Sequence, residues 1–321
     1  MLDAFTWDTI AVPTRDFNVR QLIGTMPVPC FWGRDIKGSC LFIIELKGDH
    51  SAQYRKNLST VNGVRVDLRE DTDEQQRLVL TLENEANRDL FGGLCRTLAN
   101  ALTHATDSAS SLSVALTHIR RWKTFFSGWD GAQLSADEVR GLFAELCFLQ
   151  ELLDNTSTRQ TALAAWLGPE RSHQDFIFGN SAVEIKSLSG VERNSVRISS
   201  EDQLESLNDG LFLRIYRLSS LEGAVGARSL NDIVVEIQAS LDWELQEALD
   251  KKLAKQRYAP FPSYDAPRFV VSEIRNFHVT EKFPKLIRSE LPNGILNLTY
   301  DIKFESIASF ECHNDVVFEG L

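Results

Sequence analysis

The fold of this 321-residue chain is decided by residues 173–186, HQDFIFGNSAVEIK. Two β-prone runs stand on either side of Gly179-Asn180, and this pattern is typical of a β-hairpin. Glycine at the first loop position fits a type II′ turn, which needs a positive φ there. A two-residue loop pairs Phe178 with Ser181 and thereby sets the register of the whole hairpin.

The predicted register gives the hairpin two different faces, because side chains alternate along each strand. One face carries four apolar side chains and is expected to pack on a core: Phe176, Phe178, Val183 and Ile185. The other face brings Asp175 opposite Glu184, with Lys186 one pleat further on. Directly opposed carboxylates, with Cβ atoms roughly 5 Å apart, repel each other and destabilise a sheet.

A cation between Asp175 and Glu184 would remove this repulsion. Hard divalent ions such as Mg²⁺ take oxygen ligands, commonly one or two carboxylates together with substrate phosphates. Lys186 adds a positive charge that can orient a water, or help deprotonate it, for attack on phosphorus. The stretch therefore predicts metal-assisted phosphodiester hydrolysis, with an exposed hairpin bearing a surface ion pair as the simpler alternative.

The segment before the hairpin predicts a helix from the capping box Ser135-Ala136-Asp137-Glu138 to about Asn155. Glu145 falls inside the apolar stripe of this helix, where an ionised carboxylate is costly unless a charged partner meets it. A metal site or a basic partner explains that placement, and a glutamate at the edge of the stripe that reaches water explains it equally. The stripe itself consists of Leu142, Leu146, Leu149, Leu152 and Leu153.

The segment after the hairpin predicts a second helix beginning at Ser200-x-x-Gln203. Gln203 either reaches toward the hairpin or merely completes a capping box. A strand over Leu211–Leu218 extends the sheet, and one long helix is expected over Leu230–Arg257. A strand over Phe269–Val279 then precedes a further hairpin at Asn293-Gly294.

The first third of the chain predicts a β-rich domain, residues 1–105, closed by a helix over 88–104. Its strands are expected at 38–46, 63–68 and 77–82. Residues 106–321 would then form a helical connector, the hairpin-bearing domain and a C-terminal strand extension.

The net charge, the cysteines and the lack of certain motifs disfavour several classes of protein function. The net charge of −11 argues against binding nucleic acid by bulk electrostatics, so a DNA enzyme would need a local basic surface. The five scattered cysteines form no C-x-x-C pair, which indicates reduced thiols and no zinc ribbon. The sequence has no secretory signal and no apolar run long enough to span a membrane, and we expect a cytoplasmic protein. A serine hydrolase is disfavoured because no G-x-S-x-G elbow is present.

The order of these elements resembles the PD-(D/E)XK nuclease superfamily, and the motif-bearing core runs from about Ser135 to Leu218. The whole chain also resembles a bacterial family of PD-(D/E)XK motif proteins. The blocks that carry this wider likeness are Arg120-Arg121-Trp122, Gly141-Leu142-Phe143-Ala144-Glu145-Leu146, His173-Gln174-Asp175-Phe176 and Phe283-Pro284-Lys285-Leu286-Ile287. The sequence departs from the motif at Gln174, which stands where the motif has proline.

The resemblance implies a fold and a set of residue roles. The fold is α/β (α+β), with a restriction-endonuclease-like αβββαβ core, a mixed central sheet flanked by helices, and the additional β-rich N-terminal domain. Asp175 and Glu184 would be the metal-binding acids, Lys186 the catalytic lysine, and Glu145 the acid that completes or supports the metal site. Gln203 would be the catalytic glutamine of the following helix.

The resemblance also implies a function and partners. The expected activity is that of a Mg²⁺-dependent DNA endonuclease, with Mn²⁺ as a substitute ion, in restriction or phage defence. DNA is the expected partner, with other restriction or defence proteins as further partners, no membrane, and a homodimer for cutting both strands. The alternative is a catalytically silent nuclease-fold subunit that binds DNA or serves as a scaffold in a defence complex.

Overall fold

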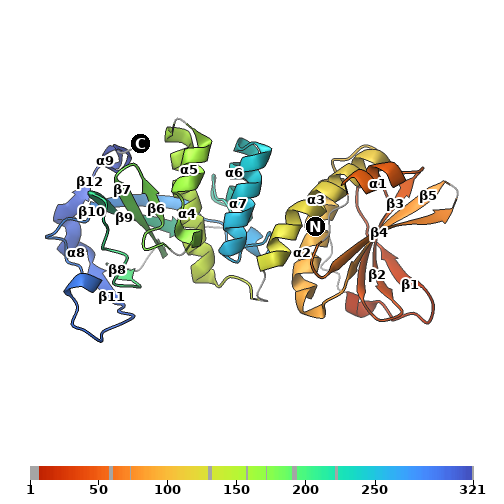
Figure 1. Cartoon of the computed structure of the whole chain (residues 1–321), viewed down its shortest axis with the longest axis horizontal. Coiled ribbons are helices and arrows are strands. Elements are labelled where there is room, and N and C mark those ends of the chain that lie inside the picture. Colours follow the sequence, from red (N-terminus) through yellow and green to blue (C-terminus); the bar gives the residue numbers. More distant parts are fainter. Residues whose placement is uncertain are drawn as a thin grey trace. The chain divides into compact units, whose positions relative to one another are not determined.

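We describe the protein from a computed structural model of the chain (Figure 1). It divides into two compact units: Met1–Gln133 with Arg257–Phe261, and Leu134–Gln256 with Pro262–Leu321. The sequence placed the division at 105/106, whereas the helix that follows that point lies in the N-terminal unit. The residues described are 7–57, 61–72, 74–128, 132–156, 158–170, 172–189, 194–220 and 223–319.

The N-terminal unit is built on an antiparallel sheet with strand order β1-β2-β3-β5-β4. The strands are β1 (Phe17–Gln21), β2 (Cys30–Asp35), β3 (Cys40–Lys47), β4 (Val64–Thr72) and β5 (Gln75–Leu82). The short 3₁₀ turn η1 (Trp7–Thr9) precedes β1, and the 3₁₀ turn η2 (Glu85–Asn87) follows β5. The helices are α1 (Ser51–Asn57), α2 (Arg88–Leu102) and α3 (Ser108–Gly128). The three strands and the closing helix predicted for this region are confirmed.

The C-terminal unit contains a mixed sheet with strand order β12-β10-β9-β7-β6 (Figure 1). These strands are β6 (Phe176–Phe178), β7 (Ser181–Ser189), β9 (Gly210–Ser219), β10 (Val270–His278) and β12 (Glu311–Cys312). Strands β7 and β9 are parallel, and the other neighbouring pairs are antiparallel. The protein is therefore a mixed α/β protein, as expected, with several sheets of which one is mixed.

Both faces of the sheet around β6 and β7 are covered. Phe148 of α4 (Ala136–Asn155) packs edge-on against Phe176, with ring centroids 4.8 Å apart. The opposite face packs on a second apolar cluster that includes Ala182, Leu188 and Leu213. Strands covered on both faces bury almost all their side chains, and in β7 only Lys186, Ser187 and the last residue, Ser189, are more than slightly exposed.

The remaining helices and short elements surround this sheet. They are α5 (Arg159–Ala165), η3 (Gly168–Glu170), α6 (Leu230–Ser240), α7 (Trp243–Lys255), η4 (Pro262–Asp265), η5 (Arg288–Glu290), α8 (Phe304–Ile307), η6 (Ala308–Phe310) and α9 (Asn314–Phe318). None of the helices in the described part of the chain is long and apolar enough to cross a bilayer.

Three sequence predictions for the C-terminal unit are wrong. No helix begins at Ser200-x-x-Gln203; the residues from Glu201 to Leu204 form turns. The long helix is two helices, α6 and α7, because Asp242 accepts a hydrogen bond from the Leu245 N–H and starts a new helix. The Asn293-Gly294 turn has the expected positive φ at Gly294 but opens no hairpin.

The strand after that turn pairs elsewhere. β11 (Tyr300–Lys303) forms a separate two-stranded sheet with β8 (Ser195–Ile198). β8 therefore lies outside the central sheet, and the described chain passes from β8 to β9 without a helix. The αβββαβ order expected from the resemblance is thus altered at its third strand and its second helix.

Candidate active site

The hairpin at residues 173–186 has the predicted register: Phe176 pairs with Val183, Ile177 with Ala182 and Phe178 with Ser181. Gly179 has φ +53°, the positive value that the predicted turn requires. The register follows from the turn chemistry and the alternation of side chains, so this part of the site was determined locally.

Asp175 is held immediately before β6 by three backbone contacts. Its carbonyl accepts hydrogen bonds from the N–H groups of Leu167, at 2.7 Å, and Gly168, at 3.0 Å. Its carboxylate Oδ2 accepts the N–H of Ile185 at 2.8 Å. The Asp175 side chain is therefore fixed against the strand that carries Glu184 and Lys186.

Glu184 and Lys186 form an ion pair, with Lys186 Nζ 2.8 Å from Glu184 Oε1. Glu184 is only 2% exposed, while Lys186 and Asp175 keep partial access to solvent. Lys186 Nζ also donates to Gln203 Oε1 at 3.0 Å. The predicted proximity of Gln203 to the hairpin is therefore present, although Gln203 lies on a turn.

Glu145 comes to the same place from α4, whose Ser135–Glu138 capping box is formed as predicted. All five leucines of the predicted apolar stripe are buried, so the helix presents Glu145 toward the sheet. The indole Nε1 of Trp166 donates to Glu145 Oε2 at 2.8 Å. The carboxylate is therefore directed inward.

Gly168 marks the point where the carboxylates converge. A Cβ at this position would lie 2.8 Å from Glu145 Oε2, 3.2 Å from Asp175 Oδ1 and 3.4 Å from the amide nitrogen of Gln256. Glycine leaves this space open, so the two carboxylate oxygens lie no further apart than the sum of their distances to that point. The sequence analysis treated Gly168-Pro169 only as a helix end and missed Gly168, Trp166 and Gln256.

The carboxylates share a negative environment that disfavours their ionisation. Burial, together with Asp175, raises the pKa of Glu145 well above its ordinary value. Burial and Asp175 raise the pKa of Glu184 to about 8, against the partial opposition of Lys186. Burial also raises the pKa of Asp175, although Lys186 and the Ile185 N–H act the other way.

The same negative environment favours the charged form of Lys186. Burial alone would favour the neutral amine, but the negative charges of Glu184 and Asp175 outweigh it and raise the pKa of Lys186 above its ordinary value. Lys186 is therefore an ammonium group at neutral pH. We call Glu145, Asp175, Glu184 and Lys186, with the space at Gly168, the carboxylate cluster.

The carboxylate cluster fits a hard divalent cation by its chemistry. Its donors are carboxylate oxygens, and the open space at Gly168 lies between two of them. Across the ranges that the structure describes, no three Asp, Glu, His or Cys side chains are already gathered around one ion position. The fit therefore rests on two carboxylates with a third beside them, which is the usual extent of a protein Mg²⁺ site.

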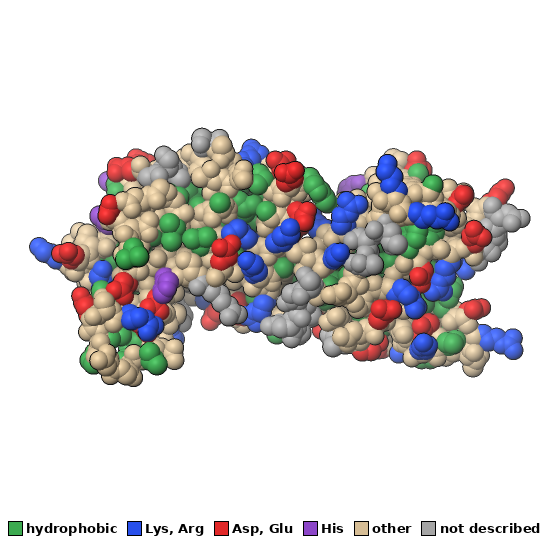
Figure 2. All heavy atoms as spheres, in the orientation of Figure 1, with side chains coloured by type: hydrophobic (Ala, Val, Ile, Leu, Met, Phe, Trp, Pro, Cys, Tyr) green, Lys and Arg blue, Asp and Glu red, His purple; other side chains and the backbone are tan. Residues whose placement is uncertain are grey.

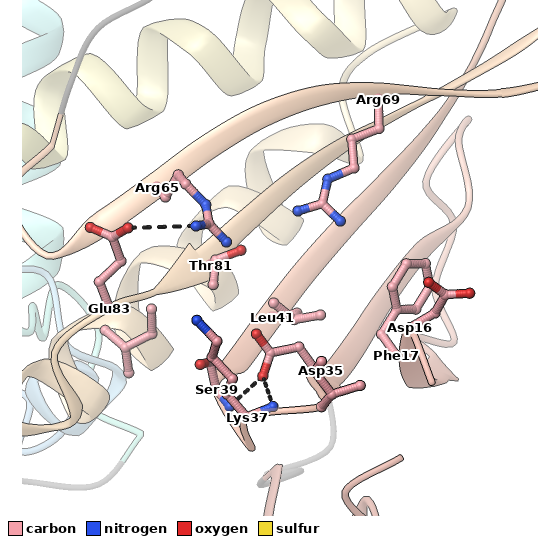
Figure 3. A pocket seen from close by; sticks show the side chains of 12 residues that line it. Asp16, Phe17, Asp35, Lys37, Ser39, Leu41, Arg65, Arg69, Thr81 and Glu83 are labelled. Atoms are coloured by element: carbon pink, nitrogen blue, oxygen red, sulfur yellow. Dashed lines mark hydrogen bonds and ion pairs between the residues drawn. The ribbon is translucent and has the colours of Figure 1, made fainter. Parts of the chain in front are cut away.

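The N-terminal unit contains a second polar region, a pocket of about 470 Å³ lined by residues of its sheet (Figure 3). Arg65, Thr81 and Leu41 lie in one row across β4, β5 and β3 and form part of its lining. Both Arg65, at 3.1 Å, and Arg69, at 3.2 Å, contact the same carboxylate, that of Asp67. Arg65 also lies 3.9 Å from Glu83.

The charges of this pocket balance one another. Its basic side chains are Lys37, Arg65 and Arg69, and its acidic side chains are Asp16, Asp35 and Glu83. Figure 2 shows the same mixture over the face that it draws, where basic side chains stand in small groups among acidic ones. The pocket therefore has no excess of positive charge that would favour a nucleic-acid strand.

Comparison with known proteins gave one match. A family model described as "Putative PD-(D/E)XK family member, (DUF4420)" matches residues 4–305. No curated protein and no solved structure matched the chain. The matched region includes every residue of the carboxylate cluster.

Proposed function

The chain belongs to the PD-(D/E)XK family whose model spans nearly its whole length, and from this premise we propose that it is a metal-dependent DNA endonuclease acting in restriction or phage defence. The family suggests a nuclease. The observation that carries the finer proposal is the carboxylate cluster. Its three acids and one lysine come from α4, the residue before β6, and β7, and they share a partly buried site.

Asp175 and Glu184 would hold Mg²⁺, with Mn²⁺ as a substitute, and Glu145 would support the site from α4. A bound ion of this kind supplies Lewis acidity and makes a water more acidic for attack on phosphorus. The backbone N–H of Ile185 and the indole of Trp166 orient the acids Asp175 and Glu145, respectively. Ligands held in this way keep their geometry when the substrate arrives.

Lys186 would stabilise the negative charge that develops on the phosphate. It faces two acceptors, Glu184 Oε1 and Gln203 Oε1, and its raised pKa keeps it protonated. An ammonium group in a partly buried site interacts strongly with a phosphate oxygen and needs little reorganisation. These properties favour charge stabilisation over removal of a proton from water.

The proposal is tested by Asp175→Ala and Lys186→Ala in a DNA cleavage assay with Mg²⁺ or Mn²⁺. We expect each variant to lose at least about a hundredfold in rate while its circular dichroism spectrum is unchanged. Asp67→Ala is the matched control and should cleave normally, because Asp67 lies in the N-terminal unit and contacts Arg65 and Arg69 of the balanced pocket. Undiminished cleavage by both Asp175→Ala and Lys186→Ala would refute the proposed activity.

One observation favours a second candidate, a catalytically silent subunit that binds DNA or scaffolds a defence complex. The chain carries a net charge of −11, which opposes binding to a polyanion. Calorimetry with Mg²⁺ and Mn²⁺ separates the two candidates. An absence of ion binding at millimolar concentration would favour the silent subunit, and binding abolished by Glu184→Gln would favour the enzyme.

A further inference from the structure

The position where the PD-(D/E)XK motif has proline is occupied by Gln174, whose side-chain amide lies near three backbone carbonyls. Gln174 is 3% exposed, and its amide Nε2 donates toward the backbone carbonyls of Asp202 (3.0 Å), Gln203 (3.4 Å) and Glu205 (2.8 Å). Proline has no side-chain donor and cannot make any of these contacts.

These contacts explain why the turn at residues 201–205 is not a helix. In an α-helix the three carbonyls would accept N–H groups four residues further along the chain. Here Gln174, about thirty residues away in sequence, supplies the donor. The backbone bonds within the turn are long, from the N–H of Gln203 to Ser200 and from the N–H of Glu205 to Asp202, each at 3.3 Å, and the Ser200 hydroxyl accepts the N–H of Asp202 at 3.2 Å. Gln174 therefore supplies backbone contacts that the turn does not make internally.

A second anchor holds the other side of the same turn. Arg288 donates to Asp202 Oδ1 at 2.7 Å and to Glu201 Oε1 at 2.9 Å. Glu201 is buried, and its Oε2 also accepts the backbone N–H of Leu298 at 2.9 Å. These contacts hold the side chains of Glu201 and Asp202, whereas Gln174 binds the backbone carbonyls of Asp202 and Glu205, and leaving its buried amide unsatisfied would be costly.

The turn delivers the side chain of Gln203 to Lys186. Gln203 Oε1 accepts both Lys186 Nζ, at 3.0 Å, and the backbone N–H of Ser199, at 2.8 Å. With Glu184 Oε1 as the second acceptor, two of the three ammonium N–H groups of Lys186 meet described residues. The third N–H is then available to a phosphate oxygen, and its direction is set by the other two.

We propose that Gln174 is a positioning residue: it fixes the turn that carries Gln203, and through Gln203 it aims the Lys186 ammonium group at the reacting phosphate. This role rests on the proposed nuclease function. The role also accounts for glutamine in place of the motif proline. The contacts from Gln174 to the turn, which we call the tether, hold the segment between β8 and β9, where no helix is present.

The first test measures the tether without any reaction. Gln174→Met keeps an unbranched side chain of similar length but removes the donor, and Gln174→Asn keeps the amide but shortens its reach. Gln238→Met is the matched control, since Gln238 is a buried glutamine of α6 that donates to Asp250. We expect amide hydrogen exchange over residues 199–206, and labelling of Lys186 by an amine reagent, to accelerate in both Gln174 variants but not in the control.

The second test asks whether Gln174 acts through Gln203. We expect Gln174→Met to lower kcat on DNA by about tenfold or more with little change in KM, and to leave Mg²⁺ affinity unchanged. The double variant Gln174→Met/Gln203→Ala should be no slower than Gln203→Ala alone, because residues that act as one unit are not additive.

The two tests fail in distinguishable ways. If the wild type cleaves no DNA, the proposed function fails, and hydrogen exchange and Lys186 labelling still decide the tether. Unchanged exchange over residues 199–206 in the Gln174 variants would overturn the tether. Losses in kcat that multiply in the double variant would overturn the action through Gln203.

Discussion

The carboxylate cluster of the C-terminal unit and the pocket of the N-terminal unit are both rich in charged side chains, yet their charges are arranged in opposite ways. In the pocket, Arg65 and Arg69 share Asp67, and acids and bases are equal in number. In the carboxylate cluster, three acids share one lysine, and Glu184 is buried. The first arrangement is balanced as it stands, whereas the second carries an excess of negative charge when its acids are ionised, which a bound cation would offset.

This difference explains why the carboxylate cluster is the better candidate for chemistry. Buried carboxylates that lie close together are costly to ionise, so other contacts must hold them in place. Here the Ile185 N–H donates to Asp175 and the Trp166 indole donates to Glu145, and these hydrogen bonds hold the two carboxylates in place. A balanced, exposed pair such as Arg65–Asp67 needs no such support and contributes little to stability.

The first prediction tests the contrast between the two regions where we expect the largest effect, a substitution at Gly168. Gly168→Ala places a Cβ 2.8 Å from Glu145 Oε2, so that this oxygen must shift from the position in which it accepts the Trp166 hydrogen bond. We expect divalent-ion affinity to fall roughly 10–100-fold, the range for changes next to metal ligands, and cleavage to fall with it. Calorimetry and a cleavage assay measure both.

Gly141→Ala is the matched control for Gly168→Ala. Gly141 lies on the same helix as Glu145, and no atom stands within 4 Å of its added Cβ. Replacing a helix-interior glycine by alanine should stabilise the protein by roughly 0.5–1 kcal/mol and leave ion affinity unchanged. Equal ion affinity in Gly168→Ala and Gly141→Ala would mean that the carboxylates do not converge at Gly168.

The second prediction contrasts two glutamates. Glu145→Gln keeps an acceptor for Trp166 but removes a carboxylate whose pKa is raised well above normal by burial and by Asp175. We expect the ion-free protein at pH 8 to gain about 1–3 kcal/mol in unfolding free energy, because a neutral side chain carries no penalty for ionisation. Ion affinity should fall about tenfold.

Glu45→Gln is the counterpart in the N-terminal unit. Glu45 lies 3.0 Å from Arg77, and both side chains are partly exposed. Its substitution should lower the unfolding free energy, by at most about 1 kcal/mol. Urea unfolding in a chelating buffer compares the two variants, and effects of the same sign in both would contradict the distinction between the two regions.

The third prediction concerns pH. In the folded protein Glu184 keeps its proton up to a pKa of about 8, whereas the unfolded chain releases it near 4.5. Between these values the folded state binds more protons at Glu184, so the contribution of this group to the unfolding free energy of the ion-free protein falls as pH rises. The slope is at most about 1.4 kcal/mol per pH unit for one proton.

Saturating Mg²⁺ should suppress this slope by holding Glu184 ionised in the folded state. Denaturation midpoints from pH 5 to pH 8, with and without Mg²⁺, measure the effect. The range above about pH 6.5 decides, because buried His118, whose pKa is lowered to about 3, makes stability rise with pH below it. Ion-free stability that rises between pH 7 and pH 8 would contradict the raised pKa of Glu184.

The sequence predicted those parts of the site that depend on local chemistry. The hairpin register followed from Gly179-Asn180 and from the alternation of side chains, and α4 followed from its capping box. These features involve contacts of short range, which the order of residues specifies. The place of Glu145 in the apolar stripe allowed either an inward carboxylate or one that reaches water, and the Trp166 hydrogen bond shows that it is directed inward.

The parts that the sequence could not provide depend on distant contacts. Ser200-x-x-Gln203 has the signature of a helix start, but Gln174 takes the carbonyls that such a helix would use. Gly168-Pro169 has the signature of a helix end, and only the folded chain shows two carboxylates closing on Gly168. A local pattern cannot distinguish a glycine needed for a turn from one needed for a close approach.

The smallest expected effect belongs to Arg65→Ala in the N-terminal pocket. Half of the Arg65 side chain is exposed, and its partners Asp67 and Glu83 are also open to solvent. We expect a change in unfolding free energy within about 1 kcal/mol and unchanged DNA cleavage and ion binding. Urea unfolding and the cleavage assay check these outcomes. A loss of cleavage at unchanged stability would make the pocket a substrate contact, and balanced charge would then no longer separate a solvated surface from a working site.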